Sequence, residues 1–168
     1  MATINSAYGS YTAITVTSLQ SLASSATAGW QSGRIDNQTS VKALDYEIFV
    51  KLTTANTAPA NDKAAYIYIS PAITTDGGTT WLHADQGTTT LPTGSEGTTT
   101  IASPNNLKLL GILSYTTQQM VMQGSFNLSS AVGQSMPDGF SIIVVNYTGA
   151  ALSTTCVVAY RAITNTVA

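Results

Sequence analysis

The sequence predicts a single all-β domain, an antiparallel β-sandwich of about eight strands. Three observations lead to this prediction. Apolar and polar residues alternate over several short windows, turn-forming residues separate these windows, and 168 residues with 43% hydrophobic content suit one core. We expect the domain to span residues 1–168, with an N-terminal arm at 1–11 and a long loop at 84–106.

Alternation is clearest from Leu44 to Leu52. Apolar residues occupy every second position there, and Asp45, Glu47 and Lys51 lie between them, which predicts a half-buried strand with Asp45 and Glu47 on its solvent face. Seven further windows are rich in β-branched or aromatic residues. They are Thr12–Leu19, Ala65–Ser70, Thr79–His83, Leu107–Tyr115, Gln119–Leu128, Phe140–Tyr147 and Thr154–Ile163.

One segment has helical rather than alternating spacing. Between Ser18 and Gly29, Leu19 and Leu22 recur at helical intervals and Gly29 stands where a cap would fall, but the serines oppose a helix. We expect a short helix or a turn there, followed by an extended stretch from Trp30 to Asn37.

The segment Ala84–Asn106 predicts a long loop. Gly-Thr-Thr-Thr occurs in it at 87–90 and again at 97–100, with Pro92 and Gly94 between the two blocks. Loops of this length in compact domains are either functional or mobile, so a contact surface and a solvated loop without a partner are both open readings.

Charge and composition exclude several classes of function. The net charge of −2 does not provide the positive field that binding to nucleic acid requires. The N-terminus has no basic stretch followed by an apolar run, and no apolar run reaches membrane-spanning length, so we expect neither export nor a membrane partner. With 27 threonines and 18 serines against 8% charged residues, hydroxyl groups replace charges on this surface.

The sequence contains little that resembles a catalytic or cofactor-binding motif. We therefore expect that the protein has no enzymatic activity and binds no cofactor or metal. His83 is the one histidine and reads as a surface or turn residue, and Cys156 reads as a small buried residue in a strand. No Gly-x-Ser-x-Gly elbow or phosphate-binding glycine loop is present. Trp30 and Trp81 could stack on sugars, although a place in the core or at its rim is the more usual role.

Several short motifs occur in a recognisable order along the chain. They are Ser18–Ser24, Asp36–Asn37, Asp45, Asn61–Lys63 leading into Tyr66–Tyr68, Asp76–Gly78 and Leu109–Gly111, followed by the two most specific, Pro137–Phe140 and Asn146–Leu152. In this order the motifs resemble those of small all-β virion proteins of tailed bacteriophages, which are thought to decorate the capsid or associate with the head.

This resemblance implies a jelly roll or related sandwich, no enzymatic activity and many copies on a capsid. The leading hypothesis is a decoration or cement protein, made in the host cytoplasm and located on the virion, that binds the major capsid protein and self-associates, most simply as a trimer. The expected contact residues lie in the arm and the long loop: Tyr8, Tyr11, Thr88, Thr89, Thr90, Leu91, Thr98, Thr99 and Thr100. The alternative is a tail- or fibre-associated sandwich that binds host glycans through Trp30, Trp81 or tyrosines.

Overall fold

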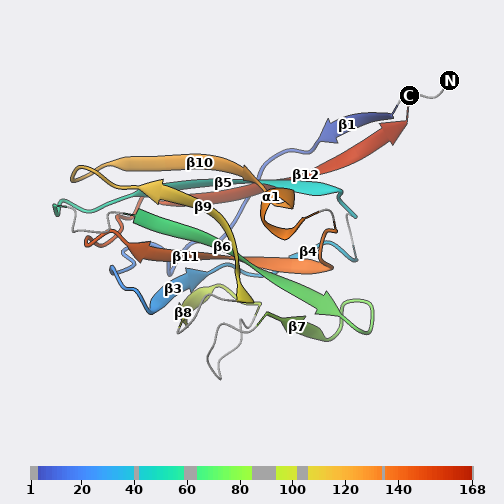
Figure 1. The fold of residues 1–168 in the computed structure, drawn as a ribbon, viewed down its shortest axis with the longest axis horizontal. Helices are drawn as coiled ribbons and strands as arrows, with labels where there is room; N and C mark the ends of the chain where they lie inside the picture. The colour runs from blue at the N-terminus through green and yellow to red at the C-terminus, as the bar shows by residue number, and fades with distance from the viewer. Residues whose placement is uncertain are drawn as a thin grey trace.

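The computed structural model describes residues 4–39, 42–58, 64–84, 94–101, 106–133 and 135–167. These residues are almost entirely β (Figure 1). The elements are β1 Ile4–Tyr8, β2 Thr12–Ala13, β3 Ala28–Gln31, β4 Ile35–Asp36, β5 Asp45–Thr53, β6 Ala64–Thr74, β7 Trp81–His83, β8 Gly97–Thr100, β9 Lys108–Ser114, β10 Val121–Asn127, α1 Ser129–Val132, β11 Gly139–Tyr147 and β12 Val157–Val167.

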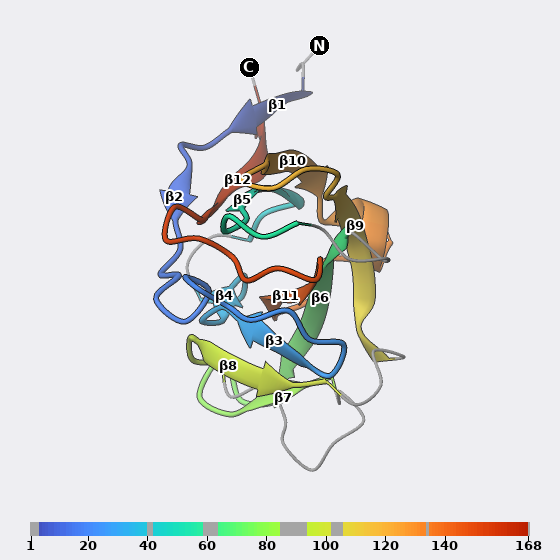
Figure 2. The same cartoon turned by 90° about the vertical axis from the view of Figure 1, so that its left-hand side faces the viewer.

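Two antiparallel sheets face each other, which confirms the predicted sandwich (Figure 2). The first, sheet A, has the order β1-β12-β5-β10, with β2 also paired to β12. The second, sheet B, has the order β7-β6-β11-β3-β8, with β9 paired to β6 and β4 to β11. Eight of these strands form the layers β2-β12-β5-β10 and β3-β11-β6-β9, which is the pairing of a jelly roll.

The core fills the space between the sheets. Every second residue of β5 from Tyr46 to Leu52 is buried, as the alternation predicts, and faces the apolar residues of β6 and β11. The ring of Tyr46 packs edge-on against Phe140 of β11 with centroids 5.2 Å apart. Leu44 differs from the prediction because it lies before β5 and is exposed.

Strand positions are largely confirmed, with three main differences of length. β12 begins at Val157 rather than Thr154 and continues to Val167 rather than ending at Ile163. Thr12–Leu19 is a strand only at Thr12–Ala13, because the chain turns at residues 17–21, where Ser21 has a φ of 60°. β6 is longer than predicted and continues through Pro71. This proline lies where β6 changes partner, since Ile69 pairs with Lys108 of β9 and Ala72 pairs with His83 of β7.

The helix considered for Ser18–Gly29 is wrong, and its alternative, a turn, is confirmed. Gly29 caps nothing, because it lies inside β3. A Cβ atom on Gly29 would come within 2.7 Å of the carbonyl oxygen of Val144, so close approach of the two backbones explains the glycine. The extended stretch from Trp30 to Asn37 contains the end of β3 and all of β4.

The prediction of a continuous loop over 84–106 is wrong for its second Gly-Thr-Thr-Thr block. Residues 97–100 form β8, which pairs with β3 throughout its length. β-branched threonines suit such an edge strand, and their repetition made them resemble a low-complexity loop. Residues 85–93 and 102–105, including the first block, lie outside the described residues.

Candidate contact surface

Two exposed tyrosines of the arm meet one arginine on the outer face of sheet A. Tyr8 is 60% and Tyr11 46% exposed. The guanidinium of Arg161 lies 4.7 Å from the ring centroid of Tyr8 and 4.8 Å from that of Tyr11. Such contacts fix an aromatic ring without burying it. We call Tyr8, Tyr11, Arg161, Glu47 and Phe49 the arm cluster.

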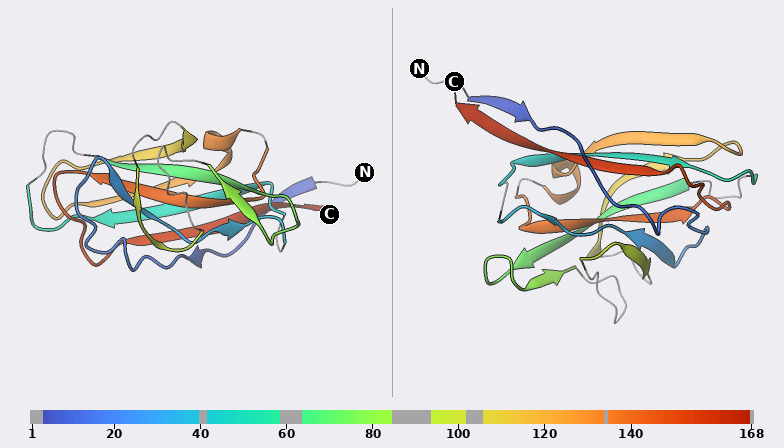
Figure 3. Two further views of the ribbon diagram at one scale, coloured as in Figure 1. Left: turned by 90° about the horizontal axis from the view of Figure 1, so that it is seen from below. Right: turned by 180° about the vertical axis from the view of Figure 1, so that it is seen from behind.

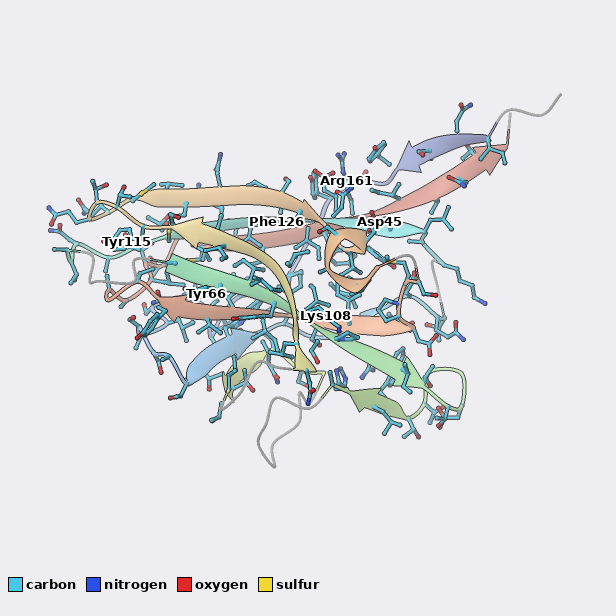
Figure 4. All side chains as sticks on the ribbon, viewed as in Figure 1. Asp45, Tyr66, Lys108, Tyr115, Phe126 and Arg161 are labelled. Atoms are coloured by element: carbon cyan, nitrogen blue, oxygen red, sulfur yellow. The ribbon has the colours of Figure 1, made fainter. Side chains whose placement is uncertain are left out.

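Strand register explains how the arm cluster forms. Arg161 of β12 stands directly opposite Glu47 of β5, and their side chains form an ion pair in which Nε donates to the carboxylate at 2.6 Å. Figure 4 shows Arg161 close to the point where β1 leaves the sandwich. Two residues further along β5, Phe49 packs edge-on against Tyr11. The prediction that Glu47 lies on the solvent face of its strand is therefore confirmed. Its partner, Arg161, could be identified only from the register between β12 and β5.

Acid is expected to weaken the arm cluster. The hydrogen bond from Arg161 holds the pKa of Glu47 below its usual value, despite the opposing effect of partial burial. A carboxyl group whose pKa is lower in the folded state than in the unfolded state stabilises the fold at any pH above its unfolded-state pKa. This contribution is lost as the pH falls through the folded-state pKa. Glu47→Gln should therefore lower the thermal midpoint at pH 7 and have a vanishing effect in strong acid. A difference that stays constant across the pH range would contradict this role.

The threonines predicted as contacts do not join the arm cluster. Thr98 and Thr100 are exposed on β8, at an edge of sheet B, whereas Thr99 is buried. Thr88, Thr89, Thr90 and Leu91 lie outside the described residues. The structure thus brings Tyr8 and Tyr11 together and places the described threonines on a different sheet.

A second exposed apolar surface, which the sequence analysis did not single out, lies on sheet B. Leu109 and Ile112 of β9 are each about half exposed and stand opposite Tyr68 and Tyr66 of β6. The two tyrosine rings stack on each other with centroids 6.4 Å apart. The period-2 pattern predicted both strands, but a bulge between Ile67 and Tyr68 sets which β9 residues share this face.

A groove runs along the arm between the two sheets. Two adjoining hollows, each of about 230 Å³, share Thr12 and Tyr160. The carboxylates on their borders are Asp36 and Glu96, and both already accept hydrogen bonds from the chain itself. These acids therefore serve the fold, which leaves the groove a surface of mixed polar and apolar residues with Tyr160 shared by both hollows.

The remaining candidate residues have structural surroundings. His83 is not a surface or turn residue as predicted. It lies half-buried in β7, where burial and the charge of Arg34 lower its pKa. Cys156 is buried, as predicted, but it lies directly before β12 rather than in a strand, and burial raises the pKa of its thiol. Asp45 does not simply face solvent, because its carboxylate accepts hydrogen bonds from Ser129 N and Oγ at the start of α1.

Neither tryptophan presents a free ring. Trp30 is fully buried, which confirms its predicted place in the core, and its indole N–H donates to Glu96. The guanidinium of Arg34 covers one face of Trp81 at 4.2 Å from the ring centroid, and the indole N–H donates to the carbonyl of Gly78. Sugar stacking on Trp30 is therefore excluded in this fold.

Two further properties concern metals and membranes. Among the described residues, no group of three or more His, Cys, Asp or Glu lies close enough to hold a metal ion. In the same part of the chain, no helix is long and apolar enough to cross a membrane.

Comparisons with known protein families, curated proteins and solved structures found no match to this chain.

Proposed function

We propose that this chain is a non-enzymatic structural protein of a tailed-phage virion, a decoration protein that binds the outer surface of the major capsid shell and stabilises it. The observation that carries the proposal is the arm cluster. It presents two large aromatic side chains that are exposed and yet held in place, as protein interfaces favour.

The chemistry of the surface also supports a protein contact. Hydroxyl groups outnumber charged groups on this chain, and hydroxyls lose less free energy than carboxylates or ammonium groups when a neighbour covers them. Arg161, which supports both tyrosines, is already neutralised by Glu47. Covering the arm cluster would therefore bury a compensated charge rather than an isolated one.

The motifs that resemble phage virion proteins have structural roles in this fold. Asp138 accepts a hydrogen bond from the backbone N–H of Thr74, Asn146 bridges two neighbouring segments, and Gly149 has a φ of 81°. The jelly roll itself occurs in capsid proteins and in lectins, so it does not separate the two hypotheses. Glycan binding through the tryptophans is disfavoured because Trp30 is buried and Arg34 covers a face of Trp81, which leaves the tyrosines as the basis of that alternative.

The copy number of the protein in purified virions tests the proposal. We expect a stoichiometry near one copy per major capsid subunit, or one trimer per three subunits, by quantitative mass spectrometry. A count typical of a portal, tail or fibre would overturn capsid decoration, and absence from the particle would overturn any virion role.

Removing the rings of the arm cluster should weaken capsid binding. We expect the double substitution Tyr8→Ala and Tyr11→Ala to reduce affinity for undecorated capsids by about a hundredfold, because each aromatic anchor of an interface contributes about 1–2 kcal/mol. Binding is measured by co-sedimentation, and circular dichroism checks the fold. Tyr147→Ala is the matched control, since Tyr147 is a partly exposed tyrosine at the end of β11 in sheet B. Equal affinities of the double variant and the wild type would show that the arm cluster is not the contact.

Deleting all of 84–106 is a poor test of the loop. The deletion would remove β8 and also Glu96, whose carboxylate binds Ser18 and the buried Trp30. Loss of capsid binding would then follow from a damaged fold. Replacing Thr88, Thr89, Thr90 and Leu91 alone with serine and glycine is the sharper experiment.

A further inference from the structure

β1 and the last residues of β12 form a two-stranded ribbon that projects from the sandwich (Figure 1 and the right-hand view of Figure 3). Ile4–Tyr8 pairs with Ile163–Val167 over its whole length. Pairing of β12 with β5 ends at Ile163 opposite Asp45. Within the described residues, the ribbon therefore has two open edges, one along β1 and one along β12 from Thr164 onward.

Neither edge carries the usual protection against pairing. Exposed edges are commonly guarded by lysine, proline or inward-pointing charges. The residues Ile4–Tyr8 and Ile163–Val167 include no charged residue and no proline. An isolated two-stranded ribbon is also marginally stable in water, so further strands beside it would stabilise it.

The largest described side chains of the ribbon lie on one of its two faces. The register places Ile4, Ser6, Tyr8, Ile163 and Asn165 on the face that continues the outer side of sheet A, and Asn5, Ala7, Thr164 and Thr166 on the other. Ile4 is 65% exposed near the free end of the ribbon. Burial of this apolar end against like residues would remove it from water.

We propose that three copies of this chain assemble through the ribbon, with β1 of each copy pairing along the open edge of β12 in the next. This inference rests on the proposed self-association of the decoration protein and assigns a surface to it. A two-fold dimer joined at one edge would leave the other edge of each copy open. In a closed ring, β1 of each copy pairs with β12 of the next, so that both edges of every copy are paired. Three ribbons supply six strands, between the five of OB-folds and the eight of small closed barrels.

Ile4→Glu tests this assembly. In the trimer, the substitution would bring three carboxylates together at the apolar end of the ribbons, while in a monomer the side chain stays in water. We expect sedimentation equilibrium at micromolar concentration to give a trimer for the wild type and a monomer for Ile4→Glu. Val121→Glu is the matched control, because Val121 is an exposed apolar residue on β10, at the opposite edge of sheet A, and this variant should remain trimeric.

Other outcomes overturn the inference. A wild-type monomer or dimer would exclude the three-ribbon assembly, and a trimer that survives Ile4→Glu would place self-association elsewhere. Unchanged circular dichroism and urea midpoints verify that both variants fold. A monomer in solution that occurs in virions at capsid stoichiometry would overturn this inference alone. A ribbon-dependent trimer that is absent from virions would instead overturn the proposed function.

Discussion

Replacing Asn146 with alanine is expected to lower the free energy of unfolding by about 3 kcal/mol, a large share of what a domain of this size possesses. The Asn146 side chain is completely buried at the end of β11. Its amide nitrogen donates to the carbonyl oxygens of Leu22 and Ala150 at 2.9 and 2.8 Å. Its oxygen accepts from the hydroxyl of Thr148 at 2.7 Å and from the backbone N–H of the same residue.

These contacts show why the loss should be large. Asn146 links the turn after β11 to the segment that precedes β3, two parts of the chain separated by 124 residues. Alanine would leave the buried N–H of Thr148 without this acceptor and would also leave a cavity. Asn146→Asp should cost still more, since a carboxylate oxygen would face two carbonyl oxygens in the interior.

Urea unfolding followed by circular dichroism measures the effect. Asn127→Ala is the matched control, because Asn127 also belongs to an Asn-x-Ser/Thr tripeptide but is exposed at the end of β10. The control should change stability by less than about 0.5 kcal/mol. Equal effects of the two alanine variants would mean that the hydrogen bonds of Asn146 contribute little.

Local sequence patterns were sufficient to predict the central strands of the two sheets. β5 has one face in the core, so its buried residues alternate along the strand, whereas β11 is buried on both faces and was predicted by its run of β-branched and aromatic residues. The turn at Asp76–Gly78 was also predictable, since the Asp76 carboxylate accepts hydrogen bonds from the backbone of Thr79 and Thr80. These features depend on residues close together in the sequence.

The features that were missed depend on residues far apart. The threonines after Gly97 suit an edge strand, but they do not show that one forms, because its stabilising partner is β3, almost 70 residues earlier in the chain. The pair Arg161 and Glu47 is likewise set by the register between β12 and β5. The sequence analysis predicted Tyr8 and Tyr11 as contact residues, but the arginine that holds them could not be identified before that register was known.

The second large effect is expected at Glu96, which the sequence analysis did not single out. Its Oε1 atom accepts a hydrogen bond from the indole N–H of Trp30 at 2.7 Å and from the backbone N–H of Ser18 at 2.6 Å. Because Trp30 is fully buried, its N–H has no access to water as a substitute. Glu96 therefore ties the segment before β8 to the core and to the turn that begins at residue 17.

Glu96→Ala should lower the free energy of unfolding by about 3 kcal/mol, since it leaves one buried and one partly buried donor without an acceptor. Glu96→Gln should cost only about 1 kcal/mol, because the amide oxygen can still accept from the indole of Trp30 while the charge is lost. The two variants are compared by urea unfolding at neutral pH. We expect the free energy of unfolding to be highest for the wild type, slightly lower for Glu96→Gln and much lower for Glu96→Ala. This order distinguishes the contribution of the hydrogen bond from that of the charge. If both variants lost the same stability, the carboxylate charge rather than its bond to Trp30 would account for the role of Glu96.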